Sequence, residues 1–171
     1  MFAIRPSTPA DLPTLMDLYP RVFPDEDLRP VVTDLLTGSD PVLSLVACDD
    51  NALLAHVIFS PCHTAGPARG ALLGPLAVAP DRQRQGLGRA IVQDGLRRLA
   101  DQDMGHVLVL GDPAYYSRLG FATETQVTPP YALPDGWAPA WQSQILPGLA
   151  PLPAGGLTLP KAWMNPVYWQ A

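Results

Sequence analysis

Residues 76–88 have the sequence Leu76-Ala77-Val78-Ala79-Pro80-Asp81-Arg82-Gln83-Arg84-Gln85-Gly86-Leu87-Gly88. The apolar start is typical of a buried strand, and an apolar helical stripe begins near the end of the segment, formed by Leu87, Ile91, Val92, Gly95, Leu96 and Leu99. The polar residues between them therefore form a loop that leads into a helix N-terminus. Unpaired backbone N–H groups and the positive end of the helix dipole meet there, so the loop suits a phosphate group.

The residues of this loop favour an anionic ligand. Gly86 and Gly88 leave the backbone without a Cβ that would keep a phosphate oxygen away. Arg82, Arg84 and Arg89 add positive charge in a chain with only 11 basic residues. We therefore predict a pyrophosphate site, although these residues alone are equally compatible with a tight strand-to-helix connection. A Rossmann or Walker loop is disfavoured, because the third small residue of the former and the Gly-Lys-Ser/Thr ending of the latter are missing.

The segments before this loop predict two helices and several strands. Phe2–Arg5 is expected to form a first strand, and a capping-box-like start at Thr8 and Asp11 precedes a helical face made of Leu12, Leu15, Met16 and Tyr19. Pro20 and Pro24 are expected to break the chain, and a second helical face from Leu28 to Leu36 ends at Gly38. Strands over 42–47 and 52–60 flank a turn at Asp49-Asp50-Asn51, which predicts a hairpin.

The predicted strand 71–78 contains Gly74-Pro75, so we expect it to be locally broken or splayed. Gly105 is expected to close the helix after the loop, and the apolar segment 107–110 predicts a strand buried on both faces. Asp112 is the predicted N-cap of a short helix over 114–119 that Gly120 stops. Nine of the 21 prolines and three of the four tryptophans lie between residues 129 and 166, where we predict late strands over 141–146 and 156–159.

The order of these elements predicts an α/β (α+β mixed) sheet, with antiparallel strands first and one parallel βαβ step. A length of 171 residues fits a single domain over 1–171, with a core of about 3–125 and a Pro/Trp-rich C-terminal part of about 126–171. The net charge of −5 disfavours nucleic acid or an anionic membrane as partner. Met1–Ala10 has no signal-peptide character, so a cytoplasmic location is expected. Cys48 and Cys62 lack metal-ligand spacing, and no metal is expected.

Two short motifs resemble those of the GCN5-related N-acetyltransferase (GNAT) family. The first is Leu76-Ala77-Val78-x-Pro80-x-x-Gln83-x-x-Gly86-x-Gly88, and the second is Tyr115-Tyr116-x-x-x-Gly120-Phe121. The extended form Leu110-Gly111-Asp112-Pro113-x-Tyr115-Tyr116, with His56-Val57-x-Phe59-Ser60-Pro61 upstream, is similar to the bacterial YhbS-like branch. The resemblance runs from about Ile4 to Trp163 and implies a GNAT-like fold with splayed central strands and helices on both faces. It also implies an acetyl-CoA-dependent N-acetyltransferase.

The resemblance assigns roles to residues of this chain. It implies a cofactor-binding set for acetyl-CoA made of Leu76, Ala77, Val78, Gln83, Arg84, Gln85, Gly86, Leu87, Gly88, Arg89, Asp112 and Tyr115. It implies that Tyr116 is the general acid for the departing thiolate. Asp112 stands where many relatives have asparagine, and its N-cap role explains it without a ligand.

The general base is not identified by the resemblance. Many relatives have a glutamate on the strand before the loop, but residues 69–78 contain no acidic residue. His56 is a candidate base or substrate contact, and water is the alternative proton carrier. The acceptor is expected to be an amine of a small molecule or peptide, and a homodimer is compatible with the tryptophan-rich end. A catalytically weak acyl-CoA-binding or regulatory module with the same fold remains the alternative function.

Overall fold

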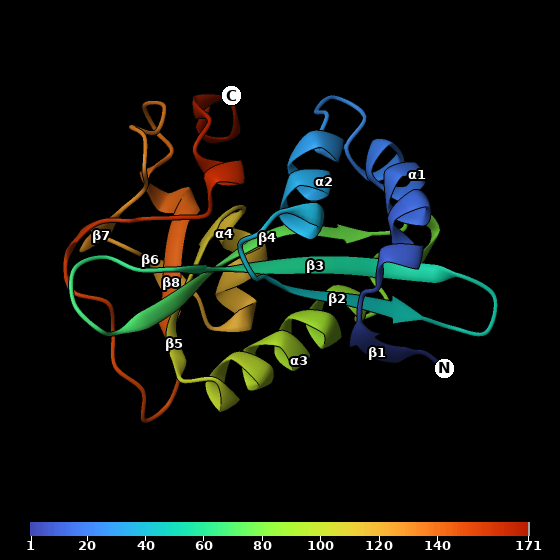
Figure 1. Cartoon of the computed structure of the whole chain (residues 1–171), viewed down its shortest axis with the longest axis horizontal. Coiled ribbons are helices and arrows are strands. Elements are labelled where there is room, and N and C mark those ends of the chain that lie inside the picture. The colour runs from blue at the N-terminus through green and yellow to red at the C-terminus, as the bar shows by residue number, and fades with distance from the viewer. Residues whose placement is uncertain (171) are drawn as a thin grey trace. The chain divides into compact units, whose positions relative to one another are not determined.

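The computed structural model of the protein describes residues 1–170 (Figure 1). The α-helices are α1 (Leu12–Val22), α2 (Arg29–Thr37), α3 (Leu87–Asp101) and α4 (Pro113–Tyr116). The strands are β1 (Ala3–Pro6), β2 (Leu43–Cys48), β3 (Leu53–Cys62), β4 (Arg69–Val78), β5 (Met104–Leu110), β6 (Ala122–Thr123), β7 (Val127–Thr128), β8 (Trp141–Ile145) and β9 (Gly155–Gly156). Short 3₁₀ turns precede α1 and α3, follow α4, and recur in the C-terminal part of the chain.

The strands form a seven-stranded mixed sheet in the order β1-β2-β3-β4-β5-β8-β6. The pairs β1–β2, β2–β3, β5–β8 and β6–β8 are antiparallel, whereas β4 and β5 run parallel. A parallel pair needs a crossover connection, and α3 provides it. The predicted α/β class with one parallel βαβ step is therefore confirmed. A separate two-stranded sheet joins β7 and β9.

The chain divides into two compact units, and the boundaries cut through β3, β4 and α3. The first unit contains Met1–Phe59 and Gly74–Gly95, and the second contains Ser60–Leu73 and the chain from Leu96 onward. The expectation of one domain stays a prediction. Within residues 1–170, none of the helices combines the length and the apolar character that a bilayer-spanning helix needs.

In the first unit, helices cover both faces of the strands. Figure 1 shows α1 and α2 on one face of β2 and β3, and α3 on the opposite face. The alternation of side chains along β3 explains this arrangement, because successive residues of a strand point to opposite faces. His56 contacts Tyr19 of α1, whereas Phe59 lies against Gly95 of α3. The predicted hairpin is also present, and its turn is held by Asp49 Oδ1, which accepts from the N–H groups of Asn51 and Ala52.

The first helix begins as predicted and continues further than predicted. The backbone N–H of Thr8 donates to the Asp11 carboxylate at 2.8 Å, just before α1. Pro20 was expected to break the chain, but it lies inside α1, which ends at Val22. Because Pro20 lies in the last turn, its missing N–H removes only one helical bond, and the next turn closes through Phe23 N–H to the Tyr19 carbonyl at 2.8 Å.

The strand β4 is irregular where Gly74-Pro75 predicted a break. Gly74 has φ +146°, a conformation that residues with a side chain rarely adopt. The ladder between β4 and β5 runs from Arg69 to Leu73, directly before this glycine.

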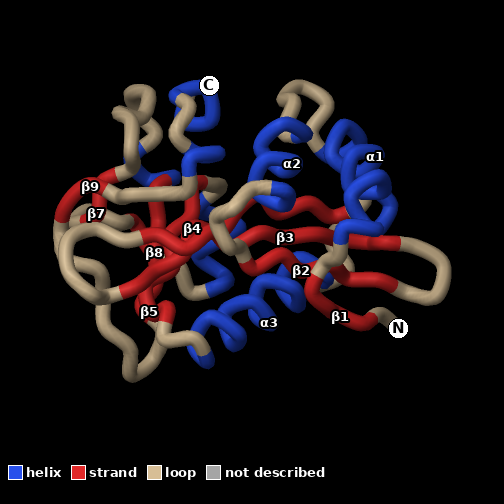
Figure 2. The backbone as a smooth tube through the Cα atoms, in the orientation of Figure 1, coloured by secondary structure: helices blue, strands red, loops and turns tan. Residues whose placement is uncertain are grey.

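In the second unit, β5 is buried along almost its whole length. It pairs with β8 along one edge, and Figure 2 shows the two strands side by side. Gly105 was expected to close α3, but the helix ends at Asp101 and Gly105 lies inside β5. The late strand predicted over 141–146 is confirmed as β8. The one predicted over 156–159 is reduced to β9 and an isolated bridge between His63 and Thr158.

The proline-rich end of the second unit is anchored by tryptophans. Trp141, Trp163 and Trp169 are buried, and the ring of Trp169 makes an edge-to-face contact with each of the other two. Each indole N–H has a partner: the Val127 carbonyl, the Ser60 hydroxyl and the Trp163 carbonyl, in that order. Burial of a Trp ring whose N–H is hydrogen-bonded adds apolar surface to the core and leaves no donor unpaired. These three rings therefore stabilise the proline-rich segment without long helices.

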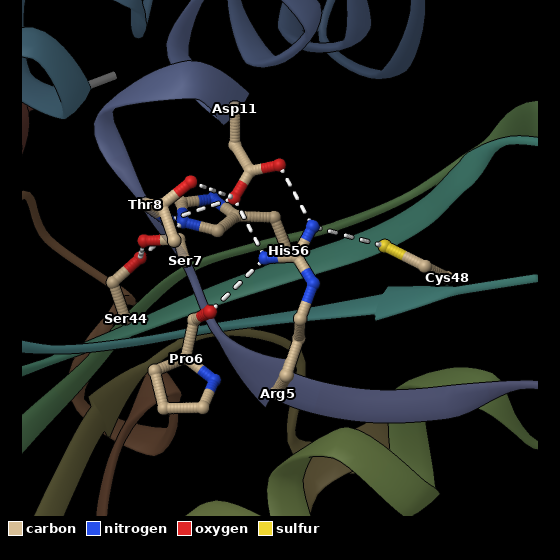
Figure 3. A network of polar contacts seen from close by, with 8 residues as sticks. All are labelled: Arg5, Pro6, Ser7, Thr8, Asp11, Ser44, Cys48 and His56. Atoms are coloured by element: carbon tan, nitrogen blue, oxygen red, sulfur yellow. Dashed lines mark hydrogen bonds and ion pairs between the residues drawn. The ribbon is translucent and has the colours of Figure 1, made fainter.

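A buried histidine joins three elements of the first unit, and Figure 3 draws it together with Ser44 and Ser7. His56 has 0% of its surface exposed, and its Nδ1 lies 2.7 Å from the Tyr19 hydroxyl. Its Nε2 lies 2.8 Å from the hydroxyl of Ser44, which is hydrogen-bonded to the hydroxyl of Ser7. A neutral imidazole carries one N–H and one lone pair, so it donates to one of its two hydroxyl partners and accepts from the other. The neutral ring is thus fully satisfied.

The same corner contains an ion pair closer to the surface. Arg5 binds both carboxylate oxygens of Asp11, at 2.8 and 2.9 Å, and also lies 3.8 Å from the sulfur of Cys48 (Figure 3). The hydrogen bond from Arg5 lowers the pKa of Asp11 to about 2. For His56, burial lowers the pKa from its ordinary value of 6.5 to about 3, and outweighs the nearby Asp11 carboxylate, which acts to raise it.

Gly95→Ala tests the packing of α3 on β3. A Cβ at this position would lie 2.1 Å from Cε2 of Phe59, so the ring must move. We expect a net loss of about 1–3 kcal/mol in the free energy of unfolding by urea, because the clash outweighs the gain of about 1 kcal/mol in helix propensity. Gln93→Ala, on an exposed position of the same helix, should stay within about 0.5 kcal/mol of wild type. Equal stability of Gly95→Ala and wild type would contradict the close contact.

The His56 environment predicts acid sensitivity. Because the folded-state pKa lies below that of the unfolded chain, the stabilisation is present above pH 6.5 and is lost as pH falls toward 3. In that window His56 contributes a slope of up to about 1.4 kcal/mol per pH unit. The melting temperature of His56→Gln should therefore fall less steeply than that of wild type as the pH is lowered from 7.5 to about 4. His63→Gln, at an exposed position, should keep the wild-type dependence of melting temperature on pH. The same dependence in His56→Gln and wild type would refute the assignment of the acid sensitivity to His56.

Candidate cofactor and catalytic site

The loop Gln83–Gly86 of the first unit is shaped by two residues with positive φ. Arg84 has φ +62° and Gly86 has φ +82°, so the chain turns sharply between the 3₁₀ turn Pro80–Arg82 and α3. Two glutamine side chains fasten the loop to itself: Gln83 Nε2 donates to the Val78 carbonyl at 3.1 Å, and Gln85 Nε2 donates to the Asp81 carbonyl at 3.4 Å. The loop backbone is therefore pre-formed, and the side-chain amide of Gln83 is already hydrogen-bonded to the strand that precedes the loop.

The N-terminus of α3 leaves backbone donors available. The N–H of Ala90 bonds to the Gly86 carbonyl at 3.0 Å, so the preceding N–H groups at 87–89 have no acceptor within the helix. A Cβ at Gly86 would meet no atom within 4 Å, which keeps the approach to these donors open on that side. Gly88 is buried under the first turn, whereas Arg89 is exposed. This end of α3 can receive an anion through its N–H groups and its dipole.

The three arginines of the loop region differ in their roles. Arg82 is paired with Asp49 of the β2–β3 turn at 3.1 Å, and so fixes the loop to the hairpin. Hydrogen bonds from Asn51 N–H, together with those from Ala52 and Arg82, lower the pKa of Asp49. Arg84 and Arg89 are exposed, and they remain the candidates for direct contact with a ligand phosphate.

The strand before the loop alternates in burial. Ala77 is fully buried, whereas its neighbours Leu76 and Val78 are partly exposed. Alternation of this kind places Leu76 and Val78 on the same face of β4. The predicted cofactor-binding residues 76–78 and 83–89 thus all lie in the first unit, on one continuous strand–loop–helix segment.

The second unit contains Asp112, Tyr115 and Tyr116. The Asp112 side chain caps α4 by accepting from Ala114 N–H at 2.9 Å, and its carbonyl accepts from the N–H groups of both tyrosines. The predicted N-cap role is therefore confirmed, with Pro113 as the first helical residue. Gly120, at φ +93°, ends the following 3₁₀ turn as predicted.

Tyr116 is packed by aromatic rings, while Tyr115 is more exposed. The ring of Tyr116 meets those of Tyr115 and Phe121 edge-on, with centroids 4.9 and 5.7 Å apart. Burial, with a smaller contribution from Tyr115, raises the pKa of Tyr116. The phenol therefore stays protonated through neutral and mildly alkaline pH, as a proton donor must.

The predicted base candidate His56 lies in a closed environment, and so does the carboxylate of Glu124. His56 is buried and has both ring nitrogens engaged by hydroxyls, an arrangement that favours a structural role over direct proton abstraction. In the second unit, Glu124 accepts from His106, Ser143 and two backbone N–H groups. Burial alone would raise the pKa of Glu124, but the bonds from Ser143 and from the Val127 and Gln126 N–H groups lower it.

Long-range partners of the site residues have no signal in the sequence. Tyr19 was predicted only as part of an apolar helical face, yet its hydroxyl satisfies His56. Asp49 was predicted as a turn residue, yet it also anchors Arg82. Across residues 1–170, the structure contains no cluster of three or more histidine, cysteine or acidic side chains that could hold a metal ion.

Comparisons with known proteins agree with this geometry. The model of the Acetyltransferase (GNAT) family matches residues 12–121. The uncharacterized N-acetyltransferase YhbS of Escherichia coli (strain K12) is 38% identical over 120 residues, which cover 69% of this chain and 72% of that protein.

Solved structures extend the likeness to almost the whole chain. The crystal structure of YhbS from Escherichia coli in complex with CoA has a TM-score of 0.83 at 29% identity, and covers 96% of this chain and 92% of that one. A GNAT family acetyltransferase from Brucella melitensis in complex with acetyl-CoA has a TM-score of 0.74 at 26% identity, and covers 95% and 97%. The family model and the sequence identity to YhbS establish that this chain belongs to the GNAT family of acetyltransferases.

Proposed function

We propose that this chain transfers the acetyl group of acetyl-CoA to an amine of a small molecule or peptide, by direct attack of the amine on the thioester in a ternary complex. The observation that carries this proposal is the pre-formed loop Gln83–Gly86 at the N-terminus of α3, with its positive φ values and open backbone donors. The complexes of the two structural relatives with CoA and acetyl-CoA support the same ligand.

The loop and strand of the first unit would bind the cosubstrate. The N–H groups from Gln85 to Arg89 would hold the pyrophosphate, with Arg84 and Arg89 adding charge. Backbone groups of Leu76 and Val78 would pair with the amides of pantetheine, as in an added strand. Asp112 and Tyr115 complete the proposed set, with Asp112 acting through the cap that shapes α4.

Tyr116 would supply the proton that the reaction needs at sulfur. The nitrogen lone pair of the amine attacks the thioester carbonyl carbon, and the C–S bond then breaks and leaves a thiolate. The phenol of Tyr116 donates its proton to that thiolate, so CoA leaves as a neutral thiol. The proton lost by the attacking amine would pass to water, because His56 is enclosed by its hydroxyl partners, and water would return a proton to the Tyr116 phenolate.

The alternative is an acyl-CoA-binding module without turnover. Its support is the lack of an acidic residue over 69–78, where many relatives have a catalytic glutamate. A calorimetric titration with acetyl-CoA, followed by a CoA-thiol release assay over a panel of amines and peptides, separates the two functions. Binding with thiol release supports the enzyme, binding without release on any acceptor supports the module, and no binding refutes both.

Gly86→Glu should abolish acetyl-CoA binding. The variant strains a φ of +82° and brings a carboxylate to the anion site, so we expect the dissociation constant to rise by at least about 100-fold. Gly136→Glu is a matched control, because Gly136 has φ +84° and equally open surroundings in a loop of the second unit. It should bind acetyl-CoA like wild type in calorimetry. Similar affinities for Gly86→Glu and Gly136→Glu would disprove the loop as the binding site.

Tyr116→Phe should spare acetyl-CoA binding and lower turnover. Removal of the phenolic proton costs the general-acid contribution, which is worth about 10²-fold or more in kcat. Steady-state CoA-thiol release measures kcat, and calorimetry measures the affinity. Tyr131→Phe, which removes a hydroxyl from another partly exposed tyrosine, should leave both values unchanged. Wild-type turnover in Tyr116→Phe would remove this residue as the acid.

A further inference from the structure

We infer that Gly111 is a positioning residue for Tyr116, and that its missing side chain sets where the phenol points. This inference rests on the proposed function of Tyr116 as general acid. Gly111 lies directly after β5 and immediately before the cap of α4, within the second unit.

The backbone of Gly111 does not itself require glycine. Its φ lies outside the left-handed region, unlike those of Gly74, Gly86 and Gly120. The backbone is also fixed from both sides: the Gly111 N–H donates to the Ala140 carbonyl at 2.9 Å, and its carbonyl accepts from Gln142 Nε2 at 3.1 Å. Alanine would therefore be tolerated by the chain conformation, and the reason for glycine must be a neighbour.

That neighbour is the ring of Tyr116. A Cβ at Gly111 would lie 2.4 Å from Cε2, 2.9 Å from Cδ2 and 3.4 Å from Cζ of Tyr116. These are the atoms nearest to the position, so the ring lies directly against the Gly111 α-carbon. No other residue type leaves that space, because every other side chain begins with a Cβ.

Two more aromatic rings pack against the Tyr116 ring. Tyr115 meets it edge-on at an interplanar angle of 81°, and the buried Phe121 meets it at 80°. The N–H of Phe121 donates to the Tyr116 carbonyl at 3.1 Å, and Gly120 makes this return possible with its φ of +93°. Packing on Gly111, Tyr115 and Phe121 therefore orients Tyr116.

A Cβ at Gly111 would displace the ring and with it the hydroxyl. Increasing the distance from the new Cβ to Cε2 of Tyr116 from 2.4 Å to an ordinary contact of 3.4 Å or more requires a shift of about 1 Å. A misplacement of about 1 Å in a reacting group can lower the rate by about 10²-fold. The proton donor would then be chemically intact but wrongly aimed.

The test is Gly111→Ala, alone and combined with Tyr116→Phe, assayed for CoA-thiol release and for acetyl-CoA affinity. We expect kcat of the single variant to fall by about 10- to 100-fold, while the affinity for acetyl-CoA changes by less than about threefold. In the Tyr116→Phe background, Gly111→Ala should change kcat by less than about twofold, because no hydroxyl remains to be misplaced. Gly156→Ala, where the new Cβ meets only Thr128 Oγ1 at 3.9 Å, is the matched control and should keep wild-type kcat.

Phe121→Leu provides a second route if Gly111→Ala fails to fold, as judged by its melting curve. It removes another aromatic ring that packs against Tyr116, so its effect on kcat should also vanish in the Tyr116→Phe background. Wild-type kcat in folded Gly111→Ala, or equal fold-losses with and without the Tyr116 hydroxyl, overturns the inference while the acid role of Tyr116 stands. Wild-type kcat in Tyr116→Phe instead overturns the acid role, and separates that failure from the other.

Discussion

The parallel pairing of β4 with β5 is the constraint on which the rest of the structure depends. Two parallel neighbours cannot be joined by a hairpin, so the chain must leave β4, cross over, and return. α3 makes the crossing, and the left-handed residues Arg84 and Gly86 turn the chain into it. The same turn leaves the first N–H groups of α3 without helical partners. One topological demand thus produces both the fold and the candidate anion site.

Much of this could be predicted from the sequence, because the determining signals are local. The glycines of the loop, the apolar stripe of α3, the Asp112 cap and the Asp49 turn each depend on residues a few positions apart. Local hydrogen bonds and helical periodicity are properties of short segments, so they can be predicted without knowledge of the fold. The element order and the mixed sheet followed from these signals together.

Two predictions about where helices end were wrong. Pro20 was expected to end α1, but a proline in the last turn costs little when the following bond, Phe23 to Tyr19, still forms. Gly105 was expected to close α3, yet it belongs to β5, where a Cβ would lie 2.4 Å from Leu149. The closed environment of His56 depends on Tyr19 and Ser44, which lie 37 and 12 residues away. No short pattern encodes such contacts.

The hydrogen bond between Trp163 and Ser60 has a consequence for how the protein reaches its folded state. The two residues are separated by 103 positions, so the chain must close a very long loop before this buried bond can form. Loop-closure entropy makes such a contact slow relative to the local turns and helices, and contacts of this range lower folding rates. The tryptophan-rich end would therefore dock late, onto a strand that earlier steps had already built. During synthesis, the bond to the Ser60 hydroxyl cannot form until Trp163 has been made, 103 residues later.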